Sequence, residues 1–323
     1  MIPATISRRA VLMGVGCALL GVRTGIAHGD DGAIRVRHSH GELTLPGAPK
    51  RIVAAGYSDL AIARALDAPL VGAMRYGAGL DGHNFPWVQP ALSPEIASVP
   101  AGRVDLDLLR ELEPDLILAA TAYHSYGDHY DRLAEIAPTL VSVRRNLRDP
   151  YADLTRLIAR LVGRPEPADR LVANADAAIA AFAERHAARR GRTIAYAQVT
   201  ANSFHPIVDE TALALDLFRR IGLKPLVDRA DGFDCNGSFM RPLADLRSIG
   251  SADIALLAPI GKAASVRELL APLPGAGTLP VVARGRAHIV DTHLYDALVA
   301  PNPVNIPFIL ARLDTILAAT PRS

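Results

Sequence analysis

The side chains best suited to chemistry in this sequence are two arginines and a set of aromatic residues. Arg103 and Arg241 each offer a planar fork of N–H donors that keeps its charge, which suits oxygen anions. Flat rings with a polar edge suit wide contact with a large organic ligand, and four of them lie in expected loops: Tyr76, Trp87, Tyr123 and Tyr126. The alternatives are solvated charges at helix starts for the arginines and ordinary loop packing for the aromatic residues.

Histidines near the middle of the chain give the best metal-like cluster. His124 and His129 flank Asp128 in one expected loop, and His293 is available from the second half of the chain. Histidine and carboxylate ligands of this kind hold zinc or manganese, and tyrosine or histidine can also serve as an axial ligand to haem. The spacing is diagnostic of neither, so bare metal and haem remain alternative ligands.

Motifs for enzymatic chemistry are scarce. Gly77 to Gly82 matches the dinucleotide fingerprint letter for letter, but the next residues run His83-Asn84-Phe85-Pro86, which cannot open the helix that binds the pyrophosphate. The sequence contains no nucleophile elbow, P-loop, His-Glu-x-x-His or paired-cysteine motif. We therefore expect a protein that is not an enzyme.

The elements that must position these residues occur twice in the sequence. Leu106, Leu109 and Leu112 precede the apolar run at 116–119, and Leu243, Leu246 and Ile249 precede the run at 254–257. Each copy predicts a short amphipathic helix, a turn with Asp and a buried strand. We expect two similar lobes, with Arg103 and Tyr123 flanking the first copy and Asn236 and Arg241 preceding the second.

Around these copies the chain alternates strands and helices. We expect a hairpin at 34–45, strands at 52–56, 69–73 and 193–199, and helices at 58–66, 210–221 and 305–319, with Ser58 or Asp59 as the cap of the first helix. Residues 151–190 predict a short helix and then a long one. The fold class is α/β, with two Rossmann-like lobes of mostly parallel sheet joined by a long interlobe α-helix.

The N-terminus reads as an export signal. Arg8 and Arg9 introduce an apolar stretch, and Ala27-His28-Gly29 offers small residues at the cleavage positions, which is typical of a twin-arginine signal peptide. The expected division is a signal peptide at 1–29, an N-terminal lobe at 30–150, connecting helices at 151–191 and a C-terminal lobe at 192–323. A lipid anchor at Cys17 is the less favoured alternative. Without Cys17, Cys235 has no partner for an internal disulfide.

The charge balance excludes one class of partner. The formal net charge is +2, and residues 1–29 hold three arginines and no acidic residue, so the remainder is close to neutral. A nucleic-acid-binding protein needs a clustered basic excess. We expect no nucleic-acid partner.

Several of these segments, in order, resemble one known family. They include Pro49-Lys50-Arg51-Ile52-Val53, Glu113-Pro114-Asp115-Leu116-Ile117-Leu118-Ala119, Leu133 to Thr139, the long helix, and Arg284-Gly285-Arg286 before Ile289. Together they resemble the periplasmic substrate-binding proteins of ABC transporters for ferric siderophores, a group that also includes cobalamin and haem carriers. The resemblance covers essentially all of the chain after the signal.

The resemblance implies roles for particular residues. In hydroxamate-siderophore carriers an Arg before the first repeated helix and a Tyr after its strand contact the ligand, and these positions fall on Arg103 and Tyr123. Acidic residues that meet the permease fall near Asp131 and Asp245, where the family usually has Glu. An aromatic residue expected before the second repeated helix is replaced by the region of Asn236.

The resemblance also implies the function. The expected protein is an exported, monomeric carrier in the periplasm or cell envelope that captures a ferric siderophore between its lobes and delivers it to an ABC permease. Iron(III) is carried within the siderophore, and no cofactor is bound permanently. The alternatives are a haem or bare metal-ion carrier of the same fold, or an exported enzyme that acts on the chelate.

Overall fold

The first lobe is built on a parallel sheet. The structure, a computed structural model, describes residues 26–28, 33–75, 85–144, 148–228, 233–234, 236–261, 263 and 265–321. The sheet order is β6-β5-β4-β7-β8. Its strands are β4 (Ile52–Ala54), β5 (Leu70–Arg75), β6 (Ala97–Pro100), β7 (Leu116–Ala119) and β8 (Thr139–Val141). The short apolar runs of β4 and β7 are buried throughout, as strands covered on both faces must be.

Four helices accompany this sheet. They are α1 (Tyr57–Ala65), α2 (Leu106–Glu111), α3 (His124–Asp128) and α4 (Tyr130–Ala134). A separate antiparallel sheet, in the order β1-β2-β3, consists of β1 (Ile26–His28), β2 (Ile34–His38) and β3 (Gly41–Leu45). The predicted hairpin at 34–45 is confirmed by the pairing of β2 with β3.

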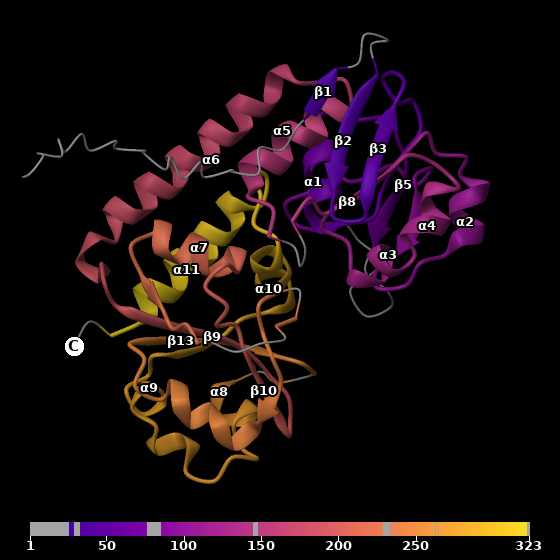
Figure 1. Cartoon of the computed structure of the whole chain (residues 1–323). Coiled ribbons are helices and arrows are strands. Elements are labelled where there is room, and N and C mark those ends of the chain that lie inside the picture. The colour runs from indigo at the N-terminus through magenta and orange to yellow at the C-terminus, as the bar shows by residue number, and fades with distance from the viewer. Residues whose placement is uncertain are drawn as a thin grey trace, which may run out of the picture.

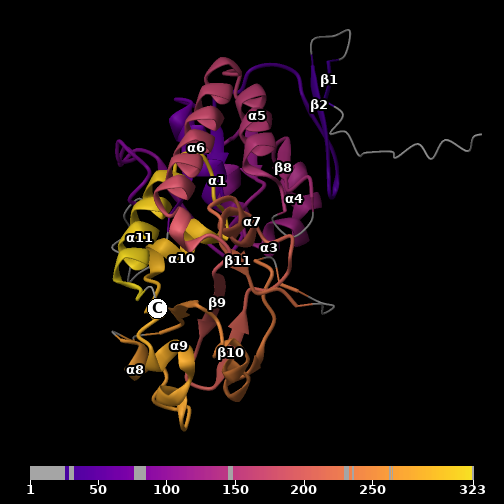
Figure 2. The ribbon, with the colours of Figure 1, turned by 90° about the vertical axis from the view of Figure 1, so that its left-hand side faces the viewer.

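Two helices connect the lobes, as the sequence predicts. They are α5 (Tyr151–Leu161) and α6 (Glu166–Arg185), and the turn η1 (Ala187–Arg189) follows them. Gly163 lies between α5 and α6 with φ +71°, a left-handed conformation that glycine adopts without strain. Figure 1 shows α6 running along one side of the molecule from the first lobe to the second, and Figure 2 shows α11 beside it.

The second lobe has a mixed sheet in the order β12-β10-β9-β13-β14, with β11 paired to β9. Its strands are β9 (Thr193–Val199), β10 (Ser203–Pro206), β11 (Lys224–Pro225), β12 (Arg241–Pro242), β13 (Ile254–Pro259) and β14 (Ala287–Ile289). Its helices are α7 (Leu213–Arg220), η2 (Leu243–Ile249), α8 (Val266–Leu269), η3 (Ala276–Thr278), α9 (Pro280–Ala283), α10 (Thr292–Val299) and α11 (Ile306–Ala319).

The second repeated helix differs from its predicted form. The segment η2 is a 3-10 helix rather than an α-helix, and Leu243, Leu246 and Ile249 are its buried residues. A spacing of three matches the three residues per turn of a 3-10 helix, so these side chains eclipse on the buried face. The repeat therefore holds at the level of strand and apolar face, while the helix types differ.

One hydrophobic core continues from one lobe into the other. It contains Tyr57 and Leu60 of α1 together with Leu294 of α10 and Ile309 of α11. Two buried hydrogen bonds cross the same junction: Ser58 Oγ donates to the Ala300 carbonyl at 3.1 Å, and Asn302 Nδ2 donates to Ser58 Oγ at 3.2 Å. The lobes are thus held together by a packed and hydrogen-bonded junction. In the described part of the chain no helix is both long and apolar enough to cross a membrane.

Candidate functional site

Two tyrosines meet where the central strands of the first sheet end. Tyr57 follows β4 and Tyr123 follows β7, and their hydroxyl oxygens lie 2.8 Å apart. Ligand sites of open α/β sheets lie outside the carboxyl ends of the strands. Tyr57 belongs to the core that the lobes share and Tyr123 packs against it, so this edge of the sheet is the one that meets the second lobe.

A buried carboxylate holds the segment that leads to Tyr123. The Asp59 carboxylate is fully buried and accepts hydrogen bonds from Ala120 N at 3.2 Å, Thr121 N at 2.7 Å and Thr121 Oγ1 at 2.7 Å. Burial raises the pKa of Asp59 to about 6, although the three donors act in the opposite direction. The carboxylate thus fixes the backbone two residues before Tyr123.

Gly56 makes this approach possible. A Cβ at residue 56 would lie 2.0 Å from Asp59 Oδ2 and 2.6 Å from Ala122 N, so only glycine fits. Gly56 is also the N-cap of α1, where no side chain makes the capping hydrogen bond. The prediction that Ser58 or Asp59 caps this helix is therefore wrong, because the Asp59 carboxylate is directed to the loop after β7.

Trp87 contacts an aromatic ring from each lobe. Trp87 stacks on Phe85 with ring centroids 4.9 Å apart, and Phe308 of α11 lies 5.2 Å from it. The Trp87 side chain is only 7% exposed, and its Nε1 is buried with no hydrogen-bond partner in the described part of the chain. Trp87 therefore lies at the junction of the lobes, and its contact with a ligand stays a prediction.

Arg103 presents its guanidinium to solvent. The side chain is 69% exposed, and its Nη2 lies 3.2 Å from Asp105 Oδ2. Asp105 also caps α2 by accepting from Leu108 N at 3.2 Å. The neighbouring residue Gly102 approaches the Tyr123 ring, since a Cβ there would lie 3.8 Å from it. Arg103 and Tyr123 thus come from adjacent loops at one edge of the first lobe.

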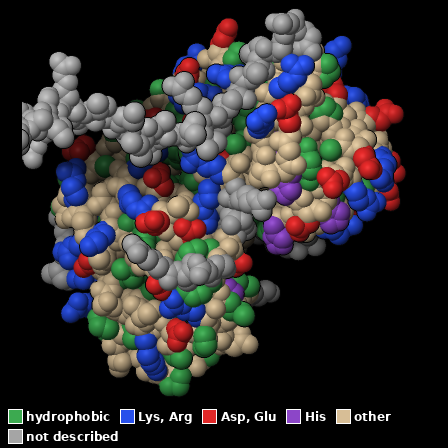
Figure 3. Space-filling view, in the orientation of Figure 1, with side chains coloured by type: hydrophobic (Ala, Val, Ile, Leu, Met, Phe, Trp, Pro, Cys, Tyr) green, Lys and Arg blue, Asp and Glu red, His purple; other side chains and the backbone are tan. Residues whose placement is uncertain are grey.

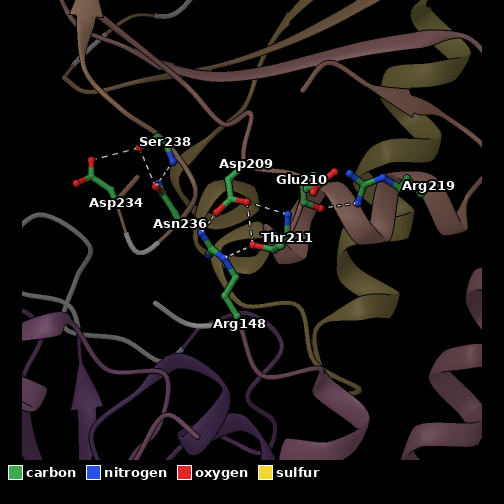
Figure 4. Close-up of polar contacts among 8 residues, drawn as sticks. All are labelled: Arg148, Asp209, Glu210, Thr211, Arg219, Asp234, Asn236 and Ser238. Carbon is green, nitrogen blue, oxygen red and sulfur yellow. Dashed lines mark hydrogen bonds and ion pairs between the residues drawn. The ribbon is translucent and has the colours of Figure 1, made fainter. Parts of the chain in front are cut away.

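The second lobe contributes an amide and a phenol. Asn236 Nδ2 donates to the Tyr295 hydroxyl at 3.1 Å, while Asn236 Oδ1 accepts from Ser238 N and Ser238 Oγ at 3.1 and 2.7 Å. Figure 4 shows the Asn236 side chain held against Ser238 in this turn. Like Tyr123, Tyr295 packs against the shared core. Both lobes therefore place a tyrosine at the rim of the same core.

A buried ion pair lies directly under that turn. Arg148, in the segment that leaves the first lobe, donates from Nη2 to Asp209 Oδ2 at 2.5 Å and from Nε to Thr211 Oγ1 at 2.8 Å. The backbone of the turn reaches the same loop, since Asp209 N donates to the Gly237 carbonyl at 3.2 Å. Figure 4 shows Arg148 reaching up to Asp209 and Thr211, close to Asn236. A cavity of about 600 Å³ adjoins Arg148 on the side of α5 and α7.

Arg241 forms an ion pair with an aspartate and stacks on an aromatic ring. Its Nη2 lies 2.6 Å from Asp228 Oδ2, and its guanidinium lies 4.2 Å from the centroid of the Phe239 ring. Phe233 meets Phe239 edge to face at 5.6 Å. The second lobe therefore does carry aromatic residues before η2, on both sides of Asn236.

We refer to these residues as the two walls of the candidate site. The first-lobe wall comprises Tyr57, Trp87, Arg103 and Tyr123, and the second-lobe wall comprises Asn236, Phe239, Arg241 and Tyr295. Figure 3 shows a notch between the lobes, with histidine side chains gathered on its first-lobe side. Of the predicted ligand residues, the structure brings the loop of Arg103 next to Tyr123 through Gly102 and brings Asn236 next to Tyr295, and it holds Arg241 against Phe239 and Asp228.

Tyr126, another predicted ligand residue, is buried. Tyr126 is 1% exposed within the core of the first lobe, where burial raises its pKa to about 12. Its hydroxyl is buried with no hydrogen-bond partner among the described residues, and its contact with a ligand stays a prediction. The reason for this burial is its position in α3, which turns the ring inward rather than into a loop. Tyr76 lies outside the described residues.

The predicted histidines are not gathered into a metal site. His124 is exposed, His129 Nδ1 lies 2.8 Å from the Ser125 carbonyl oxygen, and His293 belongs to α10 of the other lobe, with its Nδ1 buried. Among the described residues, no group of three or more His, Cys, Asp or Glu side chains is placed to hold a metal ion. The predicted docking residues Asp131 and Asp245 are exposed, on α4 and η2.

Sequence reasoning missed Tyr57, Arg148, Phe239 and Tyr295. Tyr57 directly follows the Gly56 turn after β4, which is a position the carboxyl-edge rule points to. Phe239 stands two residues before Arg241 and could be found by extending the search for an aromatic residue past Asn236. Arg148 and Tyr295 have no local signal, because their partners lie 61 and 59 residues away.

Comparisons with known proteins agree with this architecture. Residues 52–242 match the family model described as "Periplasmic binding protein". No curated protein matches the chain. A periplasmic solute binding protein from Mycobacterium smegmatis is similar in structure at 23% identity, with a TM-score of 0.74 over 90% of this chain and 99% of that protein.

Two similar structures contain ligands. PiaA from Streptococcus pneumoniae in complex with ferrichrome is 18% identical, with a TM-score of 0.71 over 90% of this chain and 99% of its own. SirA from Staphylococcus aureus, complexed with staphyloferrin B, is 17% identical, with a TM-score of 0.66 over the same shares of the two chains. At these identities the likeness is one of fold.

Proposed function

Because the chain belongs to the periplasmic binding protein family, a family of binding proteins rather than enzymes, we propose that it captures a ferric siderophore between its lobes and delivers it to an ABC permease. Iron(III) is held by the siderophore, and the protein binds the outside of the complex. Ferrichrome in PiaA and staphyloferrin B in SirA are ligands of this class in proteins of similar fold.

One observation carries the proposal. Tyr123 from the first lobe and Tyr295 from the second pack against the same shared core, and each hydroxyl is hydrogen-bonded to a second polar group of its own wall, Tyr57 or Asn236. Rings with oriented hydroxyl and amide groups in both lobes suit a large, oxygen-rich organic ligand. A bare ion would need converging charged ligands instead.

Each residue of the walls has a different proposed role in binding. Arg103 supplies exposed N–H donors to ligand oxygens, since a guanidinium fork can bind an oxygen while one Nη faces Asp105. Tyr123 and Tyr295 contribute ring surface and a hydroxyl each, and Asn236 orients Tyr295. Phe239 and Arg241 add a stacked surface at the second lobe.

Delivery uses the outer surfaces of the lobes. Asp131 on α4 and Asp245 on η2 are exposed, one in each lobe, and are proposed to meet basic residues of the permease. The carrier works as a monomer in the periplasm or cell envelope after export by the N-terminal signal. Replacing both aspartates by asparagine should abolish transport in cells and leave the affinity of the purified protein for its ligand unchanged.

The binding step is tested by titration of intrinsic fluorescence. Trp87 is the single tryptophan of the chain and lies at the junction of the lobes, so a coloured iron complex bound there should quench it. We expect saturable quenching by a ferric siderophore, and a loss of affinity of about tenfold in Arg103→Ala, a charge-assisted hydrogen bond being of that size. Arg110→Ala, which removes an exposed arginine of α2, is the matched control. Unchanged affinity in Arg103→Ala would remove this residue from the site.

A further inference from the structure

Another cavity lies in the first lobe, apart from the walls of the candidate site. It has a volume of about 270 Å³ and is bounded by β2, by the segment after β8 and by α5. Figure 2 shows α5 between α6 and the β1-β2-β3 sheet. None of the residues that line this cavity belongs to either wall. The residues proposed to bind the siderophore therefore leave this cavity without an assigned ligand.

Part of the cavity lining is apolar. Val36 of β2 and Leu154 and Leu157 of α5 line the cavity, and each is at most 6% exposed. All three belong to one hydrophobic core of the first lobe, against which Val143 also packs. Leu154 and Leu157 are three residues apart and so lie on one face of α5. An apolar group in the cavity would extend the packing of this core and leave water.

A buried carboxylate holds one side of the cavity in place. Asp149 is 6% exposed, and its Oδ2 and Oδ1 accept from Val143 N and Arg144 N at 2.8 Å each. These hydrogen bonds fix the segment after β8 against the start of α5, and both residues that Asp149 holds line the cavity. The cavity is therefore formed by a defined turn before any ligand arrives, as binding pockets usually are.

Four arginines line the same cavity: Arg37, Arg144, Arg156 and Arg160. Arg37 and Arg156 each have one exposed carboxylate partner, at 3.4 and 2.7 Å. Exposed pairs of this kind are weak, and a guanidinium has further N–H donors to offer. Arg144 and Arg160 have no carboxylate within 4.0 Å among the described residues. The cavity therefore has guanidinium donors available for a ligand.

Two aspartates also line the cavity, and neither supplies a counter-charge to Arg144 or Arg160. Both oxygens of Asp149 are bonded to backbone N–H groups, and Asp153 is exposed in the first turn of α5. Guanidinium groups around one small cavity repel one another, so a bound anion lowers their energy. We infer that this cavity binds an organic carboxylate with an apolar chain, whose carboxylate is held by Arg144 and Arg160.

The volume of the cavity sets the size of this ligand. A water molecule takes about 30 Å³ in the liquid, so the cavity corresponds to an organic molecule of about ten non-hydrogen atoms. A guanidinium fork matches the two oxygens of a carboxylate. Inorganic phosphate would leave Leu154 and Leu157 uncovered, and an uncharged alcohol would leave the arginines without an anion. Octanoate has the required size, an alkyl chain and one carboxylate.

The test is calorimetric titration of the full mature chain at neutral pH with octanoate, octan-1-ol and inorganic phosphate. We expect one octanoate per chain with a Kd below about 1 mM, and at least about tenfold weaker binding of the other two probes. Raising the ionic strength from about 0.1 M to 1 M shortens the Debye length from about 10 Å to 3 Å. This change should weaken the binding of octanoate and should not weaken that of octan-1-ol.

Two arginine variants locate the site. Arg144→Ala/Arg160→Ala removes the two guanidinium groups that lack a carboxylate partner and should weaken octanoate binding at least about tenfold. The matched control is Arg132→Ala/Arg267→Ala, which removes exposed arginines of α4 and α8 that do not line the cavity. The control should leave the affinity unchanged. Circular dichroism checks that both variants are folded, which we expect because Arg144, Arg160 and both control side chains are exposed.

An aspartate variant changes the affinity in the opposite direction. Asp153→Asn removes an exposed negative charge from the lining of the cavity, so octanoate should bind about twofold to fivefold more tightly. Asp107→Asn is the matched control, because Asp107 is also an exposed aspartate in the first turn of a helix, α2. The affinity of this control for octanoate should equal that of wild type.

Several results would overturn the inference. Octan-1-ol binding as tightly as octanoate would contradict the role of the arginines, and phosphate binding as tightly would contradict the apolar contact. The absence of saturable octanoate binding up to about 1 mM would exclude the site. Equal weakening in the two double variants would place octanoate elsewhere. Each of these results leaves the proposed siderophore function standing, because no substituted residue belongs to the walls.

Discussion

Arg148 and Asp209 form an ion pair of 2.5 Å that joins the segment leaving the first lobe to the second-lobe loop under Asn236. Both side chains are largely buried, at 11% and 15% exposure. The same Asp209 binds Arg148 through its side chain and the turn of Asn236 through its backbone. Asp209 therefore connects the segment that leaves the first lobe to the turn that carries Asn236.

Removing this cation should destabilise the fold. Arg148→Ala leaves the Asp209 carboxylate buried beside Thr211 without a counter-charge, which typically costs about 3 kcal/mol of unfolding free energy. Arg156→Ala breaks the exposed pair with Asp169 and should cost less than about 1 kcal/mol. Urea unfolding of both variants checks this. Equal losses would show that the Arg148 pair contributes no more than a surface contact.

The Arg148–Asp209 pair should also make the stability of the fold depend on pH in the acid range. Arg148 and the donors of Thr211 hold the pKa of Asp209 below its usual value of 3.8. A lowered pKa means that the stabilisation is present above pH 3.8 and is lost as the pH falls through the lower, folded-state pKa. Wild type should lose stability in this acid range more steeply than Arg148→Ala. Parallel pH profiles of unfolding would contradict this.

Asp59 should make the stability of the fold depend on pH in the opposite direction. Its pKa of about 6 lies above the usual 3.8, so its contribution to stability is full below pH 3.8 and is lost as the pH rises through 6. Relative to Asp59→Asn, wild type should lose on the order of 3 kcal/mol between pH 4 and pH 7. Asp59→Asn should be less stable at pH 4, because one amide oxygen cannot accept from all of its donors. A pH-independent difference between the two proteins would refute the raised pKa.

Gly56 tolerates no side chain. In Gly56→Ala the added methyl group would overlap Asp59 Oδ2 and Ala122 N, so we expect a loss of at least about 3 kcal/mol or failure to fold. Gly47→Ala is the control, since nothing lies within 4 Å of its Cβ position. Thermal unfolding should leave Gly47→Ala within a few degrees of wild type. A stable Gly56→Ala variant would mean that the turn after β4 can move far enough to admit a methyl group.

The hydroxyl of Tyr123 should matter for the ligand more than for the fold. In Tyr123→Phe the ring keeps its packing and a part-buried hydroxyl is lost, so stability should fall by about 1 kcal/mol and affinity for the ferric siderophore by about fivefold to tenfold. Tyr130→Phe, on the next helix, should leave affinity unchanged. Equal effects of the two variants on affinity would place Tyr123 outside the site.

The lobes could be predicted from local sequence because their signals are local. The apolar runs of β4, β7, β9 and β13 and the long helix α6 follow from composition and periodicity alone, and the structure confirms them. The type of η2 was not predictable in this way, since apolar residues three apart occur in both α-helices and 3-10 helices. Its burial against β10 and the neighbouring core decides the outcome.

The candidate site was only partly predictable because its residues come from positions far apart in the sequence. Arg103 and Tyr123 follow from their places beside the first repeat. Tyr126 stands in the same run, and one helical turn is enough to direct its ring into the core instead. The Arg148–Asp209 and Asn236–Tyr295 contacts depend on the packing of whole lobes, which no spacing in the sequence encodes.

Native mass spectrometry of the mature protein after exposure to ferric siderophores tests the central proposal most directly. We predict a complex of one chain with one intact iron–siderophore, formed at micromolar ligand and released unchanged. Binding of haem or of a bare metal ion instead, release of a chemically altered chelate, or no complex with any member of the panel would contradict the account.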